Sequence, residues 1–341
     1  MFDLQTFWFL MLGLLLTAYA VLDGFDLGVG VVHWTARDRT ERAQFIRSIG
    51  PLWDGNEVCL VAFGGAFFGA FPIAYAASFS GFYLPFMALL LGLLLRAVAI
   101  EFRDLEKANW WRNIWDVVLC LACVQTCMTF GVMIGNALRG MPIDASREFT
   151  GTLLDLGGTL PMLVGLQSVV LFGLHGTLYL RMRLAGDELK GRLTRTAWIL
   201  FATYLGMRLG LAYYTWYHLP KDWVHLLHHH LTWGAGILNG VAVLAIGVSM
   251  FQGHRVLPFL CSVANIVTLN CMLAGMLYPR LLVSSLNSDW SLTIYNSCST
   301  AGTMGLMRWV ALLGTPLALG YFAISYWVFR GQVPREDPEQ H

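Results

Sequence analysis

The sequence predicts an all-α integral membrane protein with about nine transmembrane helices. Hydrophobic residues make up 57% of the 341 positions and charged residues 13%, about half of the roughly 25% that is usual in soluble domains. Apolar runs of about 20 residues, the length that spans a bilayer, recur along nearly the whole chain. The net charge of +1 gives no reason to expect a nucleic-acid partner.

The first apolar run has no small-residue cleavage site after a short apolar core, so we expect a retained helix rather than a removable signal peptide. Residues 1–331 then form one polytopic transmembrane domain, and residues 332–341 form a short cytoplasmic tail. The predicted spans, in chain order, are 7–32, 57–78, 80–102, 114–137, 160–181, 197–218, 232–251, 256–279 and 304–329.

The distribution of Lys and Arg predicts the orientation, because short cytoplasmic loops carry an excess of these residues. With the N-terminus outside, the outward loops carry only Arg139, Arg147, Lys221 and Arg280. The inward loops and the tail then carry Arg37, Arg39, Arg42, Arg47, Arg103, Lys107, Arg112, Arg181, Arg183, Lys190, Arg192, Arg195, Arg255, Arg330 and Arg335. This bias places the C-terminus in the cytoplasm.

Five carboxylates lie in or at the ends of the first three spans: Asp23, Asp26, Asp54, Glu57 and Glu101. In this orientation all five lie on the cytoplasmic side. Charge at membrane depth is costly, so such residues mark a polar path or pair with a partner. Gly24, Gly28 and Gly30 lie beside the first two carboxylates and would let neighbouring backbones approach closely.

The chemistry of these carboxylates leaves two interpretations open. A carboxyl group in a poorly solvated site gains affinity for protons, so a series of them, bridged by Asn56 and water, could carry protons inward from the cytoplasm. Alternatively, the carboxylates pair with arginines and hold helices together. Candidate partners are Arg96, about one and a half turns before Glu101, and Arg103; Arg208 is a third intramembrane charge that needs a partner.

Metal and haem sites are not favoured by the pattern. Cys120, Cys123 and Cys127 lie among apolar residues with no nearby histidine, as buried core thiols do. A haem held between helices needs axial ligands facing each other, and His33 and His175 are the only histidines near helix interiors. The others, His218, His225 and His228 to His230, are predicted to lie in an outward loop. We therefore expect no metal site and no firmly bound cofactor.

Several motifs, taken together and in order, resemble subunit II of the cytochrome bd-type quinol oxidases, including the cyanide-insensitive branch. The resemblance covers about the whole length. The motifs are Gly24-Phe-Asp26-Leu-Gly-Val-Gly30, Trp53-Asp54-Gly55-Asn56-Glu57-Val58, Gly81-Phe-Tyr-Leu-Pro85, Arg96-Ala-Val-Ala-Ile-Glu101-Phe-Arg103, Leu174-His175-Gly176, Tyr278-Pro279, Leu292-Thr293 and Asn296.

The resemblance implies a haem-free subunit with two four-helix bundles and one peripheral helix, in the bacterial cytoplasmic (inner) membrane. It implies a partner subunit I that carries haem b and haem d, oxidises quinol on the outer side and reduces dioxygen to water. Asp54, with Asp23 and Asp26 nearby, looks like a match to the acidic positions of a proton path. The resemblance leaves open small single-helix subunits, bound lipid and a structural quinone. A proton-coupled secondary transporter is the alternative function.

Overall fold

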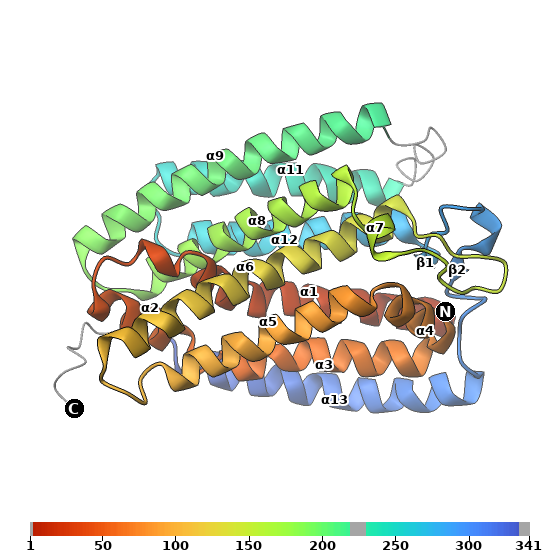
Figure 1. The fold of residues 1–341 in the computed structure, drawn as a ribbon, viewed down its shortest axis with the longest axis horizontal. Coiled ribbons are helices and arrows are strands. Elements are labelled where there is room, and N and C mark those ends of the chain that lie inside the picture. The colour runs from red at the N-terminus through yellow and green to blue at the C-terminus, as the bar shows by residue number, and fades with distance from the viewer. Residues whose placement is uncertain (1–2, 219–229, 334–341) are drawn as a thin grey trace.

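The chain is all-helical apart from one short hairpin in the computed structural model, which describes residues 3–218 and 230–333 (Figure 1). The helices are α1 (Leu4–Val31), α2 (Arg39–Ile49), α3 (Trp53–Ala70), α4 (Pro72–Gly81), α5 (Tyr83–Phe102), α6 (Asn109–Arg139), α7 (Leu153–Leu156), α8 (Thr159–Arg183), α9 (Asp187–His218), α11 (His230–Phe251), α12 (Leu257–Leu277) and α13 (Ala301–Val328). The antiparallel hairpin joins β1 (Arg280–Leu282) and β2 (Leu292–Thr293). Residues 334–341 of the expected tail lie outside the described ranges.

Seven helices in the described ranges are long and apolar enough to cross a membrane: α1, α5, α6, α8, α11, α12 and α13. The spans predicted at 57–78 and 197–218 correspond to α3 with α4 and to α9, which are not among the seven. A total of nine spans therefore stays a prediction.

The predicted second span is interrupted. Pro72 opens α4, and Phe71 before it leaves the helical conformation with φ −134° and ψ 64°. Proline has no N–H to donate and disfavours helical backbone in the preceding residue, so one helix ends at Ala70 and another begins. The continuous span expected over residues 57–78 was thus wrong in its continuity.

The long helices run side by side with α1 in the middle (Figure 1). Helix α1 contacts α3, α6, α8, α12 and α13. Helices α8 and α9 pack together on one side, where α11 also packs on α12, and α13 lies against α3 at the opposite edge. Two four-helix bundles with one peripheral helix remain our interpretation of this arrangement.

Glycines allow α1 and α8 to cross closely. A Cβ added at Gly28 would overlap the backbone of Phe172, and one added at Gly176 would overlap the backbone of Gly28. A Cβ at Gly30 would overlap the Cys123 side chain on α6. These close approaches fix the inner half of α1, which carries Asp23 and Asp26, between α6 and α8.

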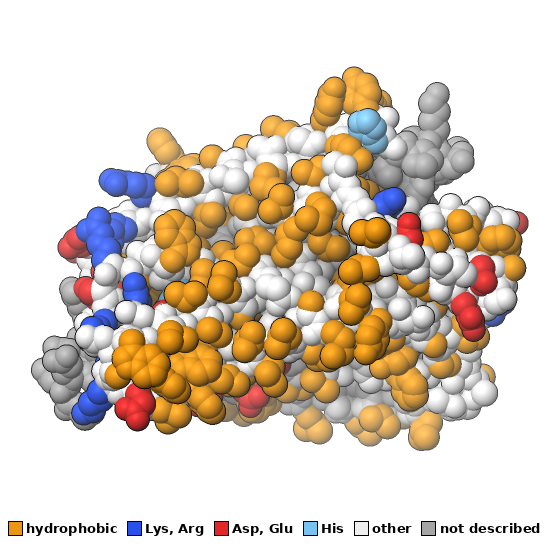
Figure 2. Space-filling model, in the orientation of Figure 1, with side chains coloured by type: hydrophobic (Ala, Val, Ile, Leu, Met, Phe, Trp, Pro, Cys, Tyr) orange, Lys and Arg blue, Asp and Glu red, His pale blue; other side chains and the backbone are white. Residues whose placement is uncertain are grey.

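The two ends of the molecule differ in composition. Lys and Arg side chains gather at the end formed by α2 and the start of α9, whereas the middle of the visible face is largely hydrophobic (Figure 2). The hairpin and α7 lie at the opposite end (Figure 1). An apolar middle between polar ends is what a bilayer requires.

Candidate functional site

Three helices bring buried polar side chains together near the α2 end of the molecule. Asp23 and Asp26 come from α1, Asn56 and Glu57 from the first turn of α3, and Arg96 from the second half of α5. Asp23, Asp26 and Arg96 are completely buried, and Asn56 is 1% exposed. We call these five residues the carboxylate cluster.

Arg96 is the cation of the carboxylate cluster. Its Nη1 donates to Asp23 Oδ1 at 2.6 Å, and its Nη2 donates to Glu57 Oε1. The Glu57 side chain keeps 25% of its surface exposed, while the other two are fully enclosed. Removing one partner of a buried ion pair leaves an uncompensated charge, which is strongly destabilising.

Asp26 is held by a neutral partner. Asn56 Nδ2 donates to Asp26 Oδ2 at 2.7 Å and to the Leu22 carbonyl oxygen at 3.2 Å. The hydroxyl of Tyr326, on α13, donates to Asn56 Oδ1 at 3.0 Å. Asp26 Oδ1 has no hydrogen-bond partner within the described part of the chain. One oxygen of this carboxyl group is therefore fixed, and the other is free to carry a proton.

The structure does not bring Asp54 and Glu101 into the carboxylate cluster. Asp54 lies on the exposed surface of α3, one turn before Glu57, and Glu101 is exposed near the end of α5. Arg96 bonds to Asp23 and Glu57 instead of Glu101. The i, i+3 spacing keeps Asp54 and Glu57 near one another on α3, so Asp54 remains adjacent to the cluster while Glu101 does not.

Arg103 belongs to a separate group of charges at the end of α5. Its Nε donates to Asp116 Oδ1 at 2.6 Å and its Nη1 to Asp104 at 2.9 Å. Asp116, on α6, also binds Arg42 and His33 Nε2, at 3.0 and 2.8 Å. Burial lowers the pKa of His33 below its usual value, although Asp116 acts in the opposite direction. This network ties the loop after α1 to α5 and α6.

Arg208 is bonded to neutral groups. Its Nη1 donates to the Tyr204 hydroxyl at 3.1 Å, and its Nη2 donates to Asn239 Oδ1. Asn239 in turn donates to Asn265 Oδ1 at 3.0 Å. Within the ranges that the structure describes, no carboxylate is bonded to Arg208. Arg208 was expected to pair with a charge, but its partners in the structure are neutral side chains that form a hydrogen-bond network.

Both buried histidines are hydrogen-bonded to protein groups. His175 Nε2 lies 3.1 Å from the Val21 carbonyl oxygen, and its Nδ1 lies 2.6 Å from Ser262 Oγ. His33 Nε2 is bound to Asp116. The described residues contain no group of three or more His, Cys, Asp or Glu side chains that could hold a metal ion. Of the histidines assigned to the outward loop, His225 and His228 to His229 lie outside the described ranges.

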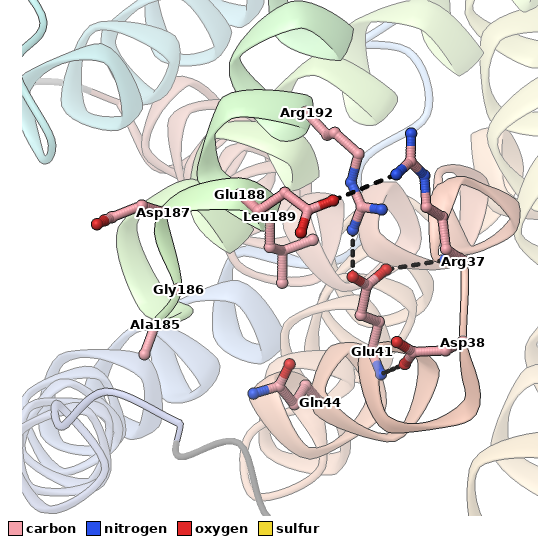
Figure 3. A pocket seen from close by; sticks show the side chains of 10 residues that line it. All are labelled: Arg37, Asp38, Glu41, Gln44, Ala185, Gly186, Asp187, Glu188, Leu189 and Arg192. Carbon is pink, nitrogen blue, oxygen red and sulfur yellow. Dashed lines mark hydrogen bonds and ion pairs between the residues drawn. The ribbon is translucent and has the colours of Figure 1, made fainter.

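A surface cavity of about 210 Å³ lies between α2 and the start of α9 (Figure 3). Glu41 accepts hydrogen bonds from Arg192 and from the Arg37 backbone N–H, and Arg37 also pairs with Glu188 at 3.3 Å. Gln44 lines the cavity and is 1% exposed. These contacts join the loop region after α1 to α9 and lie apart from the carboxylate cluster.

Sequence reasoning did not single out Tyr326 or Gln44. A single tyrosine in an apolar run is also typical of an interfacial side chain, so nothing in the sequence marked Tyr326 as a partner of Asn56. Gln44 lies in the short, charged helix α2, where a glutamine does not stand out. Both residues acquire significance only from the helix packing.

A set of apolar helices packed around a buried carboxylate–arginine cluster defines a multi-pass helical membrane protein. A family model described as cytochrome bd terminal oxidase subunit II matches residues 4–329. The chain belongs to this family, which makes it a subunit of a respiratory terminal oxidase in the bacterial inner membrane.

Known proteins agree with this assignment. The chain is 32% identical to cytochrome bd-I ubiquinol oxidase subunit 2 of Escherichia coli strain K12, over 99% of the chain and 97% of the relative. It is 31% identical to cytochrome bd ubiquinol oxidase subunit 2 of Bacillus subtilis strain 168, over 99% of both. A chain of the bd oxidase from Geobacillus thermodenitrificans has the same fold, with a TM-score of 0.76, 18% identity and coverage of 96% of this chain and 99% of that one.

Proposed function

We propose that this chain is the haem-free subunit II of a membrane quinol:dioxygen oxidoreductase and provides part of a proton path from the cytoplasm. In this proposal it packs against subunit I, which carries haem b and haem d and reduces oxygen to water. The observation that supports the path most directly is the carboxylate cluster, where two fully buried aspartates and a partly exposed glutamate meet near one end of the molecule.

The geometry suits proton transfer within the cluster. Asp26 can take up and release a proton at its free Oδ1 while Oδ2 stays bonded to Asn56. Arg96 offsets the negative charge of Asp23 and Glu57, so the site can hold several carboxyl groups without accumulating their full repulsion. The partly exposed Glu57 and the exposed Asp54 give the buried groups a connection to the surface of α3.

The orientation follows from the charges. The end with α2 and the start of α9 carries the visible concentration of Lys and Arg (Figure 2), so we assign it to the cytoplasm by the positive-inside rule. The N-terminus then lies outside and the C-terminus inside, and the carboxylate cluster lies in the cytoplasmic half of the membrane.

A one-sided path also fits the energetics. If quinol releases its protons outside and oxygen reduction takes protons from the cytoplasm, charge separates across the membrane without a pump. Moving one elementary charge against this field requires about 2.3 kcal/mol per 100 mV. The cytoplasmic connection provided by this chain would make each turnover contribute to the membrane potential.

The surface formed by α3 and α13 is the face that we assign to subunit I. None of the most apolar stretch of α13 is buried within this chain, and Leu306, Leu313 and Leu317 on it are at least 70% exposed. Val58 and Val61 continue this apolar surface on α3 beside Glu57. Packing of subunit I here would cover Glu57 and bring it next to the chain that consumes the protons.

Neutralising Asp26 in the cluster, or Asp54 beside it, tests this function. We expect Asp26→Asn and Asp54→Asn to lower quinol-dependent oxygen consumption of the purified complex by about 10-fold or more, because a positioned carboxyl group often accelerates proton transfer by about 100-fold. Haem content and the haem spectrum should be unchanged, which separates lost proton delivery from lost assembly.

Glu106→Gln is the matched control. It makes the same change from acid to amide at an exposed position in the loop between α5 and α6, and we expect wild-type turnover. Full turnover of Asp23→Asn, Asp26→Asn and Asp54→Asn in assembled complexes would show that the aspartates of the cluster and the adjacent Asp54 are structural only.

A further inference from the structure

Tyr326 contacts the Asn56 amide on the side opposite Asp26. Asn56 Nδ2 has two acceptors in front of it, Asp26 Oδ2 and the Leu22 carbonyl oxygen, and Oδ1 faces the Tyr326 hydroxyl. Turning the amide over would place Oδ1 against the two acceptors and the NH₂ group against Tyr326. The Leu22 carbonyl oxygen can only accept, so it sets the orientation in which Asp26 receives an N–H. The phenolic hydroxyl, donating to Asn56 Oδ1 at 3.0 Å, anchors the amide in that place.

A small cavity adjoins this pair. It has a volume of about 10 Å³ and is lined by residues of α3, α13 and the turn before α3, namely Pro51, Leu52, Gly55, Asn56, Tyr321, Phe322, Ser325 and Tyr326. A polar space of this size is close to the minimum for one water molecule. Because Pro51 and Leu52 precede α3 at the α2 end, the cavity lies on the side that we assign to the cytoplasm.

We propose that Tyr326 is a positioning residue at the cytoplasmic mouth of the carboxylate cluster, where it anchors Asn56 so that Nδ2 stays within hydrogen-bond distance of Asp26. This inference rests on the proposed proton path. An N–H donor stabilises the carboxylate over the carboxylic acid. By keeping this donor in place, Tyr326 sets the pH range in which Asp26 exchanges protons.

Other charged and titratable groups also act on Asp26, and each comes from a different side. Asp23 lies on the same helix, and the others are Glu57 on α3, Arg96 on α5, Cys123 on α6 and Tyr179 on α8. None of these groups bonds to Tyr326 or to Asn56. Removing the Tyr326 hydroxyl therefore loosens the donor presented to Asp26 and leaves the surrounding charges in place.

The test compares Tyr326→Phe with Tyr321→Phe in the purified oxidase complex. Both variants remove one hydroxyl from α13 beside the same cavity, but only Tyr326 is bonded to Asn56. We expect Tyr326→Phe to move the pH profile of quinol-dependent oxygen consumption to higher pH by about one unit, the size of one lost hydrogen bond to a charged group. Tyr321→Phe should keep the wild-type profile.

Two further measurements make the result decisive. Infrared titration of buried carboxylic acid bands should show the same alkaline shift without relying on turnover. Asn56→Thr removes the amide, so it should shift the profile as Tyr326→Phe does, and adding Tyr326→Phe to it should have no further effect. An additional shift in the double variant, or equal profiles for the two tyrosine variants, would overturn the role of Tyr326.

The outcomes also separate this inference from the proton path itself. If Asp26→Asn slows turnover while Tyr326→Phe leaves both the pH profile and the infrared titration unchanged, the path stands and the role of Tyr326 is wrong. If Asp23→Asn, Asp26→Asn and Asp54→Asn all turn over at the wild-type rate, the path and the inference fail together.

Discussion

Arg96 is the residue whose environment the structure changes most. In the sequence it is one of several intramembrane arginines with Glu101 as a nearby acid, whereas in the fold it is fully buried between Asp23 and Glu57 on two other helices. A guanidinium presents several donors in a rigid plane, which lets one residue connect α1, α3 and α5. Its charge thus holds three helices together.

Arg96→Gln should destabilise the chain. The substitution leaves the buried Asp23 and the half-enclosed Glu57 without their cation, and breaking such a pair typically costs about 3 kcal/mol or more. We expect a lower thermal unfolding midpoint of the purified complex. Combining Arg96→Gln with Asp23→Asn should recover part of the loss, because the second change removes a buried charge.

Arg208→Gln is the comparison for this measurement. Arg208 is only half-buried and bonds neutral side chains, so its loss should lower the midpoint less than the loss of Arg96. Equal effects of the two substitutions would mean that the charge pairing at Arg96 contributes little to stability.

At the scale of elements, the glycines of α1 position the carboxylates. Gly28 and Gly176 let the backbones of α1 and α8 approach within a distance that no larger residue allows. Small residues serve this purpose in membrane helices, where packing and hydrogen bonds replace the hydrophobic effect between helices. The proximity of Asp26 to this crossing makes its position sensitive to the packing of α8.

Gly28→Ala should disrupt the crossing. The added methyl group overlaps the Phe172 backbone, which cannot move without shifting α8, and overpacking of this kind commonly costs about 1–3 kcal/mol. We expect a lower yield of assembled complex and a lower unfolding midpoint. A Cβ at Gly13, on the same helix, meets nothing within 4 Å, so Gly13→Ala should behave as wild type. An equal defect in Gly13→Ala would mean that the defect comes from a change anywhere in α1 and not from the crossing with α8.

The breaks between elements were less predictable than the elements themselves. The apolar run over residues 57–78 reads as one span, yet Phe71 and Pro72 divide it into α3 and α4. Proline interrupts a helix locally, but whether the chain continues as a kinked helix or as two depends on what packs against the break. Phe71 and Ala74 are fully buried in the same apolar cluster as Trp8 of α1, so tertiary packing determines that geometry.

For the whole molecule, charge asymmetry predicts topology. Ser146 follows α6 at the hairpin end, and Glu188 lies in the first turn of α9 at the opposite end. We expect a membrane-impermeant maleimide, added from outside to intact cells, to label Ser146→Cys. It should label Glu188→Cys only after permeabilisation. Labelling is compared with the unsubstituted chain, which contains seven cysteines. The reverse pattern would invert the orientation and place the carboxylate cluster on the outer side.

The sequence by itself determined that this protein is a helical membrane subunit, and its ordered motifs pointed to the correct family. Long apolar runs and the Lys and Arg bias are properties of local composition, so bilayer length and the positive-inside rule suffice to interpret them. The sequence also marked Asp23, Asp26, Asn56, Glu57 and Arg96 as unusual, because polar groups in apolar runs stand out without any structure.

Only the tertiary structure decided how those groups combine. Arg96 pairs with Asp23 and Glu57, Asp26 with Asn56, and Asn56 with Tyr326, across separations of 30 to 270 residues in the chain. Such pairings depend on the rotation and depth of each helix, which side-chain packing and close glycine crossings fix. The same physical cause leaves Asp54 and Glu101 at the surface, although their sequence context resembles that of the buried carboxylates.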